Sequence, residues 1–119
     1  ADAMVTGNTR RYSSSLEKII KVVDPRPGEI MFGLNLIVNR GKTIFVCDTS
    51  VIEYPDANQL ADMAISASRV VRLFGFDPKV AFLSHSTFGQ PVTDRTKRIS
   101  DAVGILKKKS RRFAALYLC

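Results

Sequence analysis

The sequence predicts an α/β fold, a mixed sheet with helices on both faces in the order β-α-β-β-α-β-α. Short apolar runs typical of strands alternate with longer segments whose apolar residues recur at helical spacing, and this alternation is characteristic of layered α/β domains. Two strand-like runs also flank a glycine turn at residues 39–42, which predicts a hairpin and hence an antiparallel pair. With 119 residues, 45% of them hydrophobic, the chain is long enough for one domain with its own core.

The first quarter of the chain predicts a strand followed by a helix. Residues 1–5 form an apolar run that ends in the turn-forming residues 6–8, as expected at the end of a buried strand. Asn8 or Thr9 can cap the next helix, and Pro25 ends it because the residue before a proline is disfavoured in the α conformation. The apolar residues of this helix share one face: Leu16, Ile19, Ile20 and Val23.

The hairpin and a second helix occupy the middle of the chain. Residues 30–38 and 43–47 are almost entirely apolar, so both faces of the hairpin are expected to be covered. The helix begins after Asp56, a favourable N-cap, and Gln59 completes a capping box three residues later. Gly75 is placed to end this helix. Its apolar face comprises Leu60, Met63, Ala64, Ala67, Val71 and Phe74.

The last third predicts a short buried strand at residues 80–83, a polar loop at 84–92 and a final helix. Thr93 is expected to cap that helix. Its inward-facing residues are Ile99, Ala102, Val103 and Leu106. Open α/β sheets bind ligands in the loops that follow the carboxyl ends of their strands. The turn at residues 6–9 and the loop before Thr93 are therefore the places where a site is expected.

The positive charge is concentrated near the end of the chain. The net charge is +7, and from Lys97 onward there are seven basic residues and one acid. Such a segment can contact the phosphates of a nucleic acid, but Lys and Arg in the last turn of a helix also complement the helix dipole. We favour the second interpretation and do not expect nucleic acid as a partner.

Hydropathy and cysteine usage exclude further classes. No apolar run approaches the length that a membrane span requires, so we expect no membrane association. Two widely spaced cysteines, Cys47 and Cys119, do not form a disulfide framework, and they suit a reducing cytoplasm.

Few residues could carry chemistry. The single histidine, His85, adjoins Ser84, but neighbouring residues of a strand point to opposite faces, and the sequence has no Gly-x-Ser-x-Gly elbow. One histidine and two distant cysteines cannot supply a tetrahedral metal site, so we predict no catalytic residue and no metal ligand. Cys47 is expected to be a buried, unreactive thiol. Asp48 either contacts a ligand or hydrogen-bonds its own turn, and the turn is the favoured alternative.

The polar loop at residues 84–90 (SHSTFGQ) is the strongest candidate for a binding site. It combines hydroxyl groups, a glycine and several backbone N–H groups ahead of a helix, which suits an anion such as phosphate. The spacing matches neither a Walker motif nor Gly-x-Gly-x-x-Gly. The pattern alone therefore leaves an ordinary loop as the alternative.

Seven short stretches, in their order and spacing, carry a family resemblance. Residues 1–7 (ADAMVTG), 45–49 (FVCDT), 55–62 (PDANQLAD) and 75–89 (GFDPKVAFLSHSTFG) resemble the phosphate acetyltransferase family. Residues 9–13 (TRRYS), 39–43 (NRGKT) and 51–55 (VIEYP) resemble one branch of it, the phosphotransacetylase-like C-terminal domain of bacterial NADP-dependent malic enzymes. The resemblance extends to about residue 109. We therefore expect a partial phosphotransacetylase-like domain at residues 1–109 and an atypical basic and apolar tail at 110–119.

The resemblance implies a division of labour within a longer protein. In the malic enzymes, an N-terminal part oxidises and decarboxylates malate to pyruvate with NADP and a divalent metal. The phosphotransacetylase-like part is associated with oligomerisation and with regulation by acetyl-CoA. The implication is a fragment that carries no cofactor of its own, takes acetyl-CoA or phosphate as a ligand and associates at least into a dimer. The alternative is a part of an active phosphate acetyltransferase, which moves acetyl between coenzyme A and phosphate.

The resemblance also implies the residues of a site. One wall of the family's cleft for coenzyme A compounds falls, by position, on Thr6, Gly7, Ser84, Ser86, Thr87 and Gly89. The family's catalytic residues belong to a segment C-terminal to the matched stretch, so none is carried over. Active acyltransferases more often read Ser-Thr-Lys-Gly-Ser in the second loop, and this chain has Phe88 in place of the lysine. Loss of that cation removes a charged partner for phosphate, which favours regulation over acetyl transfer.

Overall fold

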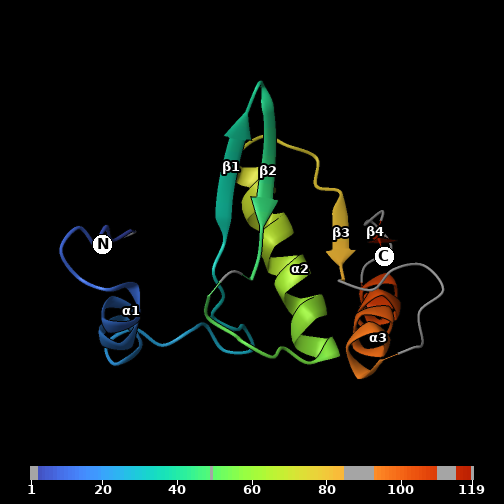
Figure 1. Cartoon of the computed structure of the whole chain (residues 1–119), viewed down its shortest axis with the longest axis horizontal. Coiled ribbons are helices and arrows are strands. Elements are labelled where there is room, and N and C mark those ends of the chain that lie inside the picture. The colour runs from blue at the N-terminus through green and yellow to red at the C-terminus, as the bar shows by residue number, and fades with distance from the viewer. Residues whose placement is uncertain (1–2, 49, 85–92, 110–114, 119) are drawn as a thin grey trace.

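The computed structural model describes residues 3–48, 50–84, 93–109 and 115–118, which form three helices and four strands (Figure 1). The order is α1 (Tyr12–Ile20), β1 (Asn35–Asn39), β2 (Lys42–Val46), α2 (Ala57–Leu73), β3 (Val80–Leu83), α3 (Asp94–Lys109) and β4 (Ala115–Leu118). The predicted α/β class is confirmed. The predicted hairpin, the second helix, the strand at residues 80–83 and the last helix are all present, and β4 is an additional strand that the sequence did not indicate.

The described strands pair in two separate sheets. β1 pairs antiparallel with β2, and β3 pairs parallel with β4, with Val80 opposite Ala115. Both kinds of pairing expected of a mixed sheet are present, but no described strand joins the two pairs. The strand expected at residues 1–5 does not form in its described part, residues 3–5, where Val5 is 99% exposed. A strand needs a neighbour for its backbone hydrogen bonds, and none of the described strands pairs with this segment.

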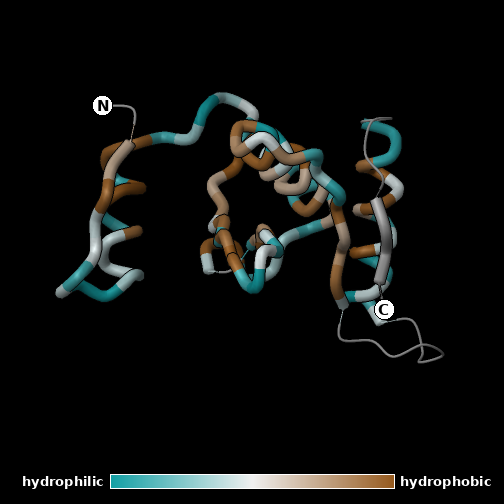
Figure 2. Tube along the Cα trace, turned by 90° about the horizontal axis from the view of Figure 1, so that it is seen from above, coloured by the Kyte–Doolittle hydropathy of each residue, from teal (hydrophilic) through white to brown (hydrophobic). Residues whose placement is uncertain are grey.

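The hairpin turns through two residues with left-handed backbone. Arg40 has a φ of 46° and Gly41 a φ of 76°, the type I′ combination that matches the twist of the two strands. The Phe45 ring meets the end of α2, with its centroid 5.5 Å from that of Phe74 and 6.2 Å from that of Phe76. The expectation that both faces are covered is wrong, because all of β1 is exposed. α2 lies along one side of the hairpin, and no described element covers the other (Figure 2).

The predicted ends of α2 are confirmed. The Gln59 N–H donates to the Asp56 carboxylate at 2.8 Å, and the Asp56 N–H donates to the Gln59 side-chain oxygen at 2.9 Å, which is a capping box. At the other end, Gly75 has a φ of 83°. The N–H groups of Gly75 and Phe76 donate to carbonyls of the last turn at 2.9 and 3.4 Å, a Schellman motif. Local sequence therefore sets both ends of this helix.

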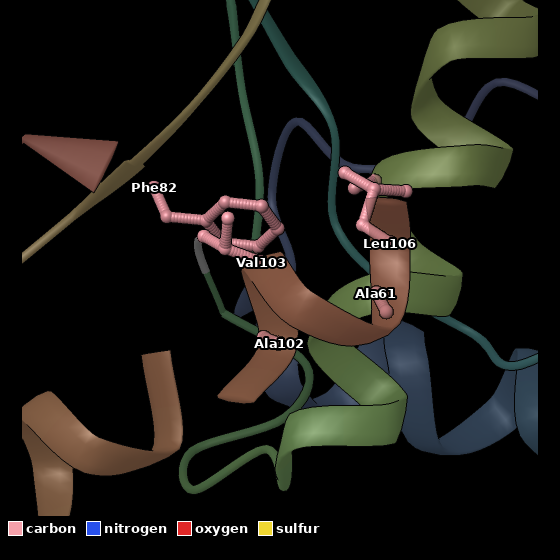
Figure 3. Packing of buried hydrophobic residues seen from close by; sticks show 6 residues of the cluster. Ala61, Phe82, Ala102, Val103 and Leu106 are labelled. Atoms are coloured by element: carbon pink, nitrogen blue, oxygen red, sulfur yellow. The ribbon is translucent and has the colours of Figure 1, made fainter. Parts of the chain in front are cut away.

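The core lies between α2, α3 and β3 (Figure 3). Thr93 caps α3 as predicted, since its hydroxyl accepts the Thr96 N–H at 3.3 Å and the Thr96 hydroxyl accepts the Thr93 N–H at 2.9 Å. The inward residues expected on α3 are confirmed, with Ile99 packed at the edge of the cluster. The buried cluster comprises Ala61, Ala64, Phe82, Ala102, Val103 and Leu106. Alanines on both helices allow α2 and α3 to approach closely.

The first helix, α1, stands apart from the other described elements in both views (Figures 1 and 2). Its N-cap is Arg11, without a side-chain hydrogen bond, so the predicted cap at Asn8 or Thr9 is wrong. Asn8 has a φ of 67°, which is incompatible with the extended conformation of an N-cap. The helix ends at Ile20, before the predicted stop at Pro25. None of its residues is buried, and a helix of nine residues has little stability in water without a packing partner.

Candidate functional site

The first predicted ligand loop is an exposed turn ahead of α1. Thr6 and Gly7 are both exposed. Gly7 has a φ of 136°, a conformation that side chains rarely adopt, and its carbonyl accepts the Thr9 N–H at 3.0 Å. A shallow, open depression is lined by Thr6 and Gly7 with Val5, Asn8 and Arg10. Arg10 is a cation beside the two predicted residues that the sequence reasoning did not single out, and a charged donor of this kind suits an anionic ligand.

The second predicted ligand loop is described only at its first residue. Ser84 is half-buried and directly follows β3, which is the position expected for a loop at the carboxyl end of a strand. Ser86, Thr87 and Gly89 lie outside the described residues, and so does His85.

The described residues do not bring the two loops together. The segment before α1 lies at one end of the long axis of the molecule and β3 lies toward the other end (Figures 1 and 2). The described parts of the two predicted loops, residues 6–7 and Ser84, are therefore separated. The ligand role of Thr6, Gly7, Ser84, Ser86, Thr87 and Gly89 remains a prediction.

The Asp48 carboxylate hydrogen-bonds the backbone of its own turn, as favoured from the sequence, and it also accepts an N–H group from outside that turn. One carboxylate oxygen, Oδ1, accepts the N–H groups of Ser50 at 3.1 Å and Val51 at 3.3 Å, and Oδ2 accepts that of Ile52 at 2.6 Å. Oδ1 also accepts the N–H of Gly33, which precedes β1, at 2.9 Å. Burial alone would raise the pKa of Asp48, but these backbone hydrogen bonds outweigh it and lower the pKa below its ordinary value. This carboxylate serves the fold, and its acceptor sites are occupied by the chain itself.

Cys47 differs from its predicted environment. The residue is exposed rather than buried, and it directly follows the last paired residue of β2. Even so, partial desolvation of the thiol, followed by the negative charge of Asp48, raises the pKa of Cys47. A raised pKa reduces the thiolate fraction at neutral pH, which agrees with the prediction of an unreactive thiol.

Several basic residues of α3 make specific contacts. The Arg98 guanidinium donates to the Pro55 carbonyl at 3.1 Å, and Lys109 Nζ lies 2.7 Å from the Asp62 carboxylate. The guanidinium carbon of Arg95 lies 6.0 Å from the centroid of the Tyr54 ring. These contacts hold α3 against the start of α2 and the loop before it. These three basic residues therefore make contacts within the fold.

The part of the chain that the structure describes contains neither a cluster of metal ligands nor a helix that could span a membrane. No group of three His, Cys, Asp or Glu side chains there could hold a metal ion. No helix among the same residues has the length and apolar character needed to cross a membrane.

The arrangement of elements has a counterpart among solved structures. EutD phosphotransacetylase from Staphylococcus aureus matches 92% of this chain with a TM-score of 0.71 and 23% sequence identity. The chain spans 34% of that structure. The likeness establishes a portion of a phosphotransacetylase-like α/β fold.

The chain belongs to the phosphate acetyl/butaryl transferase family, which it matches over residues 1–115. NADP-dependent malic enzyme of Rhizobium meliloti is 42% identical over 109 residues, or 92% of this chain. Phosphate acetyltransferase of Bacillus subtilis is 30% identical over 111 residues, also 92% of this chain. The chain spans 14% of the length of the first relative and 34% of the second. The predicted resemblance to this family and to its malic-enzyme branch is confirmed.

Proposed function

We propose that this chain is a regulatory and assembly module of an NADP-dependent malic enzyme. It contributes the loops at residues 6–7 and 84–89, whose described parts lie apart, to an inter-domain cleft that binds acetyl-CoA, and it does not itself transfer the acetyl group. Malate oxidation, with its NADP and divalent metal, belongs to another part of the parent enzyme, which we assign to the cytoplasm. The observation that carries this proposal is the higher identity to a malic enzyme, 42%, than to a phosphate acetyltransferase, 30%, over almost the same residues.

Ligand binding without transfer is supported by the chemistry of the loops. Thr6 and Arg10 offer a hydroxyl and a cation beside the left-handed backbone of Gly7, and the sequence after Ser84 is rich in hydroxyl groups. These groups suit the phosphates of coenzyme A. Phe88 stands where the active acyltransferases more often have a lysine, so the loop lacks one cation that would hold a phosphate for acetyl transfer.

An assembly role is supported by the amount of surface that the chain leaves open. Its accessible surface is 9505 Å², whereas a compact monomer of 13.2 kDa exposes about 6,400 Å². The excess includes apolar side chains of α1 and of the hairpin, such as Ile20, Ile37 and Ile44. Apolar surface of this extent favours association, and we propose that the module is at least a dimer.

A thermal-shift titration with acetyl-CoA tests the binding role. A ligand that binds only the folded state stabilises it by about 2.7 kcal/mol at 100 times its Kd, so the melting temperature should rise with acetyl-CoA and less with phosphate or free coenzyme A. The double variant Thr6→Ala/Thr87→Ala should lose most of this shift. Ser100→Ala, an exposed position on α3, removes a hydroxyl elsewhere and should keep it.

The same samples separate the proposal from its alternative. We expect no formation of acetyl phosphate from acetyl-CoA and phosphate. A measurable rate, abolished in the double variant, would instead identify an acetyltransferase. Failure of acetyl-CoA to shift either this chain or the full-length parent enzyme would refute the binding role.

A further inference from the structure

The hairpin is attached to the rest of the molecule without sharing its core. The buried cluster draws its residues from α2, β3 and α3, and none of them comes from β1 or β2. All of β1 is exposed, and β2 alternates between exposed and half-buried residues. The orientation of the hairpin must therefore be set by a small number of specific contacts.

One of these contacts lies at the base of the hairpin, where β1 begins and β2 ends. The Asp48 carboxylate, just after β2, accepts the N–H of Gly33, just before β1, at 2.9 Å. It also accepts three N–H groups of the segment that leads to α2, from Ser50, Val51 and Ile52. The Asp48 side chain thus connects the residue before β1 with the segment after β2. Hydrogen bonds with a charged acceptor are the strong ones.

Two further contacts join the hairpin and the segment before it to α2 and its end. The Phe45 ring packs on Phe74 and Phe76 at centroid distances of 5.5 and 6.2 Å, in a tilted and an edge-on arrangement. Glu29, in the segment before the hairpin, forms an ion pair with Arg69 of α2 at 2.7 Å. Both partners of this pair are partly exposed, and exposed ion pairs contribute little to stability.

We propose that Asp48 is a positioning residue that joins the two strand ends of the hairpin to each other and to the segment that leads to α2. This latch comprises the Asp48 carboxylate and the four N–H groups that it accepts. Without it, the two strands of the hairpin separate more often while the core of α2, β3 and α3 stays folded, since locally anchored segments open independently of a core to which they contribute nothing. This role is independent of acetyl-CoA binding. It holds together the base of the hairpin, whose exposed face includes Ile37 and Ile44.

Hydrogen exchange followed by mass spectrometry tests the latch. In Asp48→Ala, amides of residues 33–46 and 50–52 should exchange about tenfold or more faster, since each hydrogen bond to a charged acceptor accounts for a factor of this size. Asp48→Asn keeps one acceptor oxygen and should lie between the wild type and Asp48→Ala. Exchange in α2 and α3 should stay within about twofold of wild type, because their core is untouched.

Asp56→Ala is the matched control, because Asp56 also accepts a backbone N–H, that of Gln59, through its carboxylate. It should speed exchange in the first turn of α2 and leave residues 33–46 unchanged. Three results would overturn the latch: unaltered exchange at 33–52 in Asp48→Ala, equal loss of protection throughout the chain, or a wild-type hairpin that is already unprotected.

Discussion

At position 48, a single Asp carboxylate accepts hydrogen bonds from four backbone N–H groups that lie outside the helices and strands. A carboxylate can do this because it has only acceptors and carries a charge, so several donors can converge on it. The residue type was informative, since Asp after a strand favours a turn. The hairpin register, with Asn35 opposite Val46, continues to Gly33 opposite Asp48. The sequence did not indicate that the carboxylate would accept the Gly33 N–H, because that depends on the side-chain conformation at the base of the hairpin.

Asp48 should make stability depend on acid. Its pKa is lower in the folded chain than in the unfolded chain, so its contribution is fully present above the ordinary aspartate pKa of about 3.9. That contribution is lost as the pH falls through the lowered folded-state value. The free energy of unfolding in urea, measured from neutral to acidic pH, should show a difference between wild type and Asp48→Asn that shrinks toward zero in acid. A difference that is the same at every pH would contradict this charge effect.

Among the elements, the helices differ in how completely their own sequence defines them. α2 carries a capping box and a Schellman motif, and the structure has both. α3 has the predicted threonine cap. α1 has the apolar spacing of a helix but no side-chain cap and no buried residue. Caps act over three or four residues and can be read locally, whereas burial depends on what lies opposite.

Two glycines provide a matched test of this local control. A Cβ at either Gly75 or Gly104 would meet no atom within 4 Å, but only Gly75 has a positive φ, 83°. Gly75→Ala should therefore destabilise the chain by about 1–2 kcal/mol, the left-handed penalty of an L-residue. Gly104→Ala, inside α3, should stabilise it by about 0.5–1 kcal/mol. Urea unfolding of both variants gives the comparison, and changes of the same sign would contradict the assigned backbone conformations.

For the molecule as a whole, the small core contrasts with the large surface. The radius of gyration is 15.7 Å, compared with about 13.5 Å for a compact domain of this length. The core occupies the interface of α2, α3 and β3, whereas α1 and the outer face of the hairpin add surface without adding burial. Global stability should therefore depend on a few residues of that interface.

We expect global stability to depend most strongly on Leu106. It is 0% exposed and belongs to the buried cluster, so Leu106→Ala should reduce the free energy of unfolding by about 2–5 kcal/mol. Leu73→Ala is the control, since Leu73 is 86% exposed and exposed substitutions change stability by about 0.5 kcal/mol or less. Equal effects in chemical denaturation would mean that the core does not lie where α2 and α3 meet.

The sequence predicted the candidate site in part. It indicated both loops, and Ser84 follows β3 as expected, because strand ends and turn residues are local features. It did not indicate Arg10, which lines the depression around Gly7. Nor could it show that the segment before α1 and the end of β3 lie apart, because the distance between them depends on the packing of every element between residues 7 and 84.

By itself, the sequence determined the α/β class, the hairpin with its glycine turn, the capped ends of α2 and α3, the inward residues of α3 and the family. These depend on periodicity, on caps and on short motifs, all of which act within a few residues along the chain. Only the tertiary structure decided that the described strands pair in two sheets, that the segment at residues 3–5 forms no strand, that no described element covers α1 or one face of the hairpin, and that the Asp48 carboxylate accepts the Gly33 N–H. Those outcomes depend on which surfaces find a partner, and an apolar pattern shows that a face can be buried without showing what buries it.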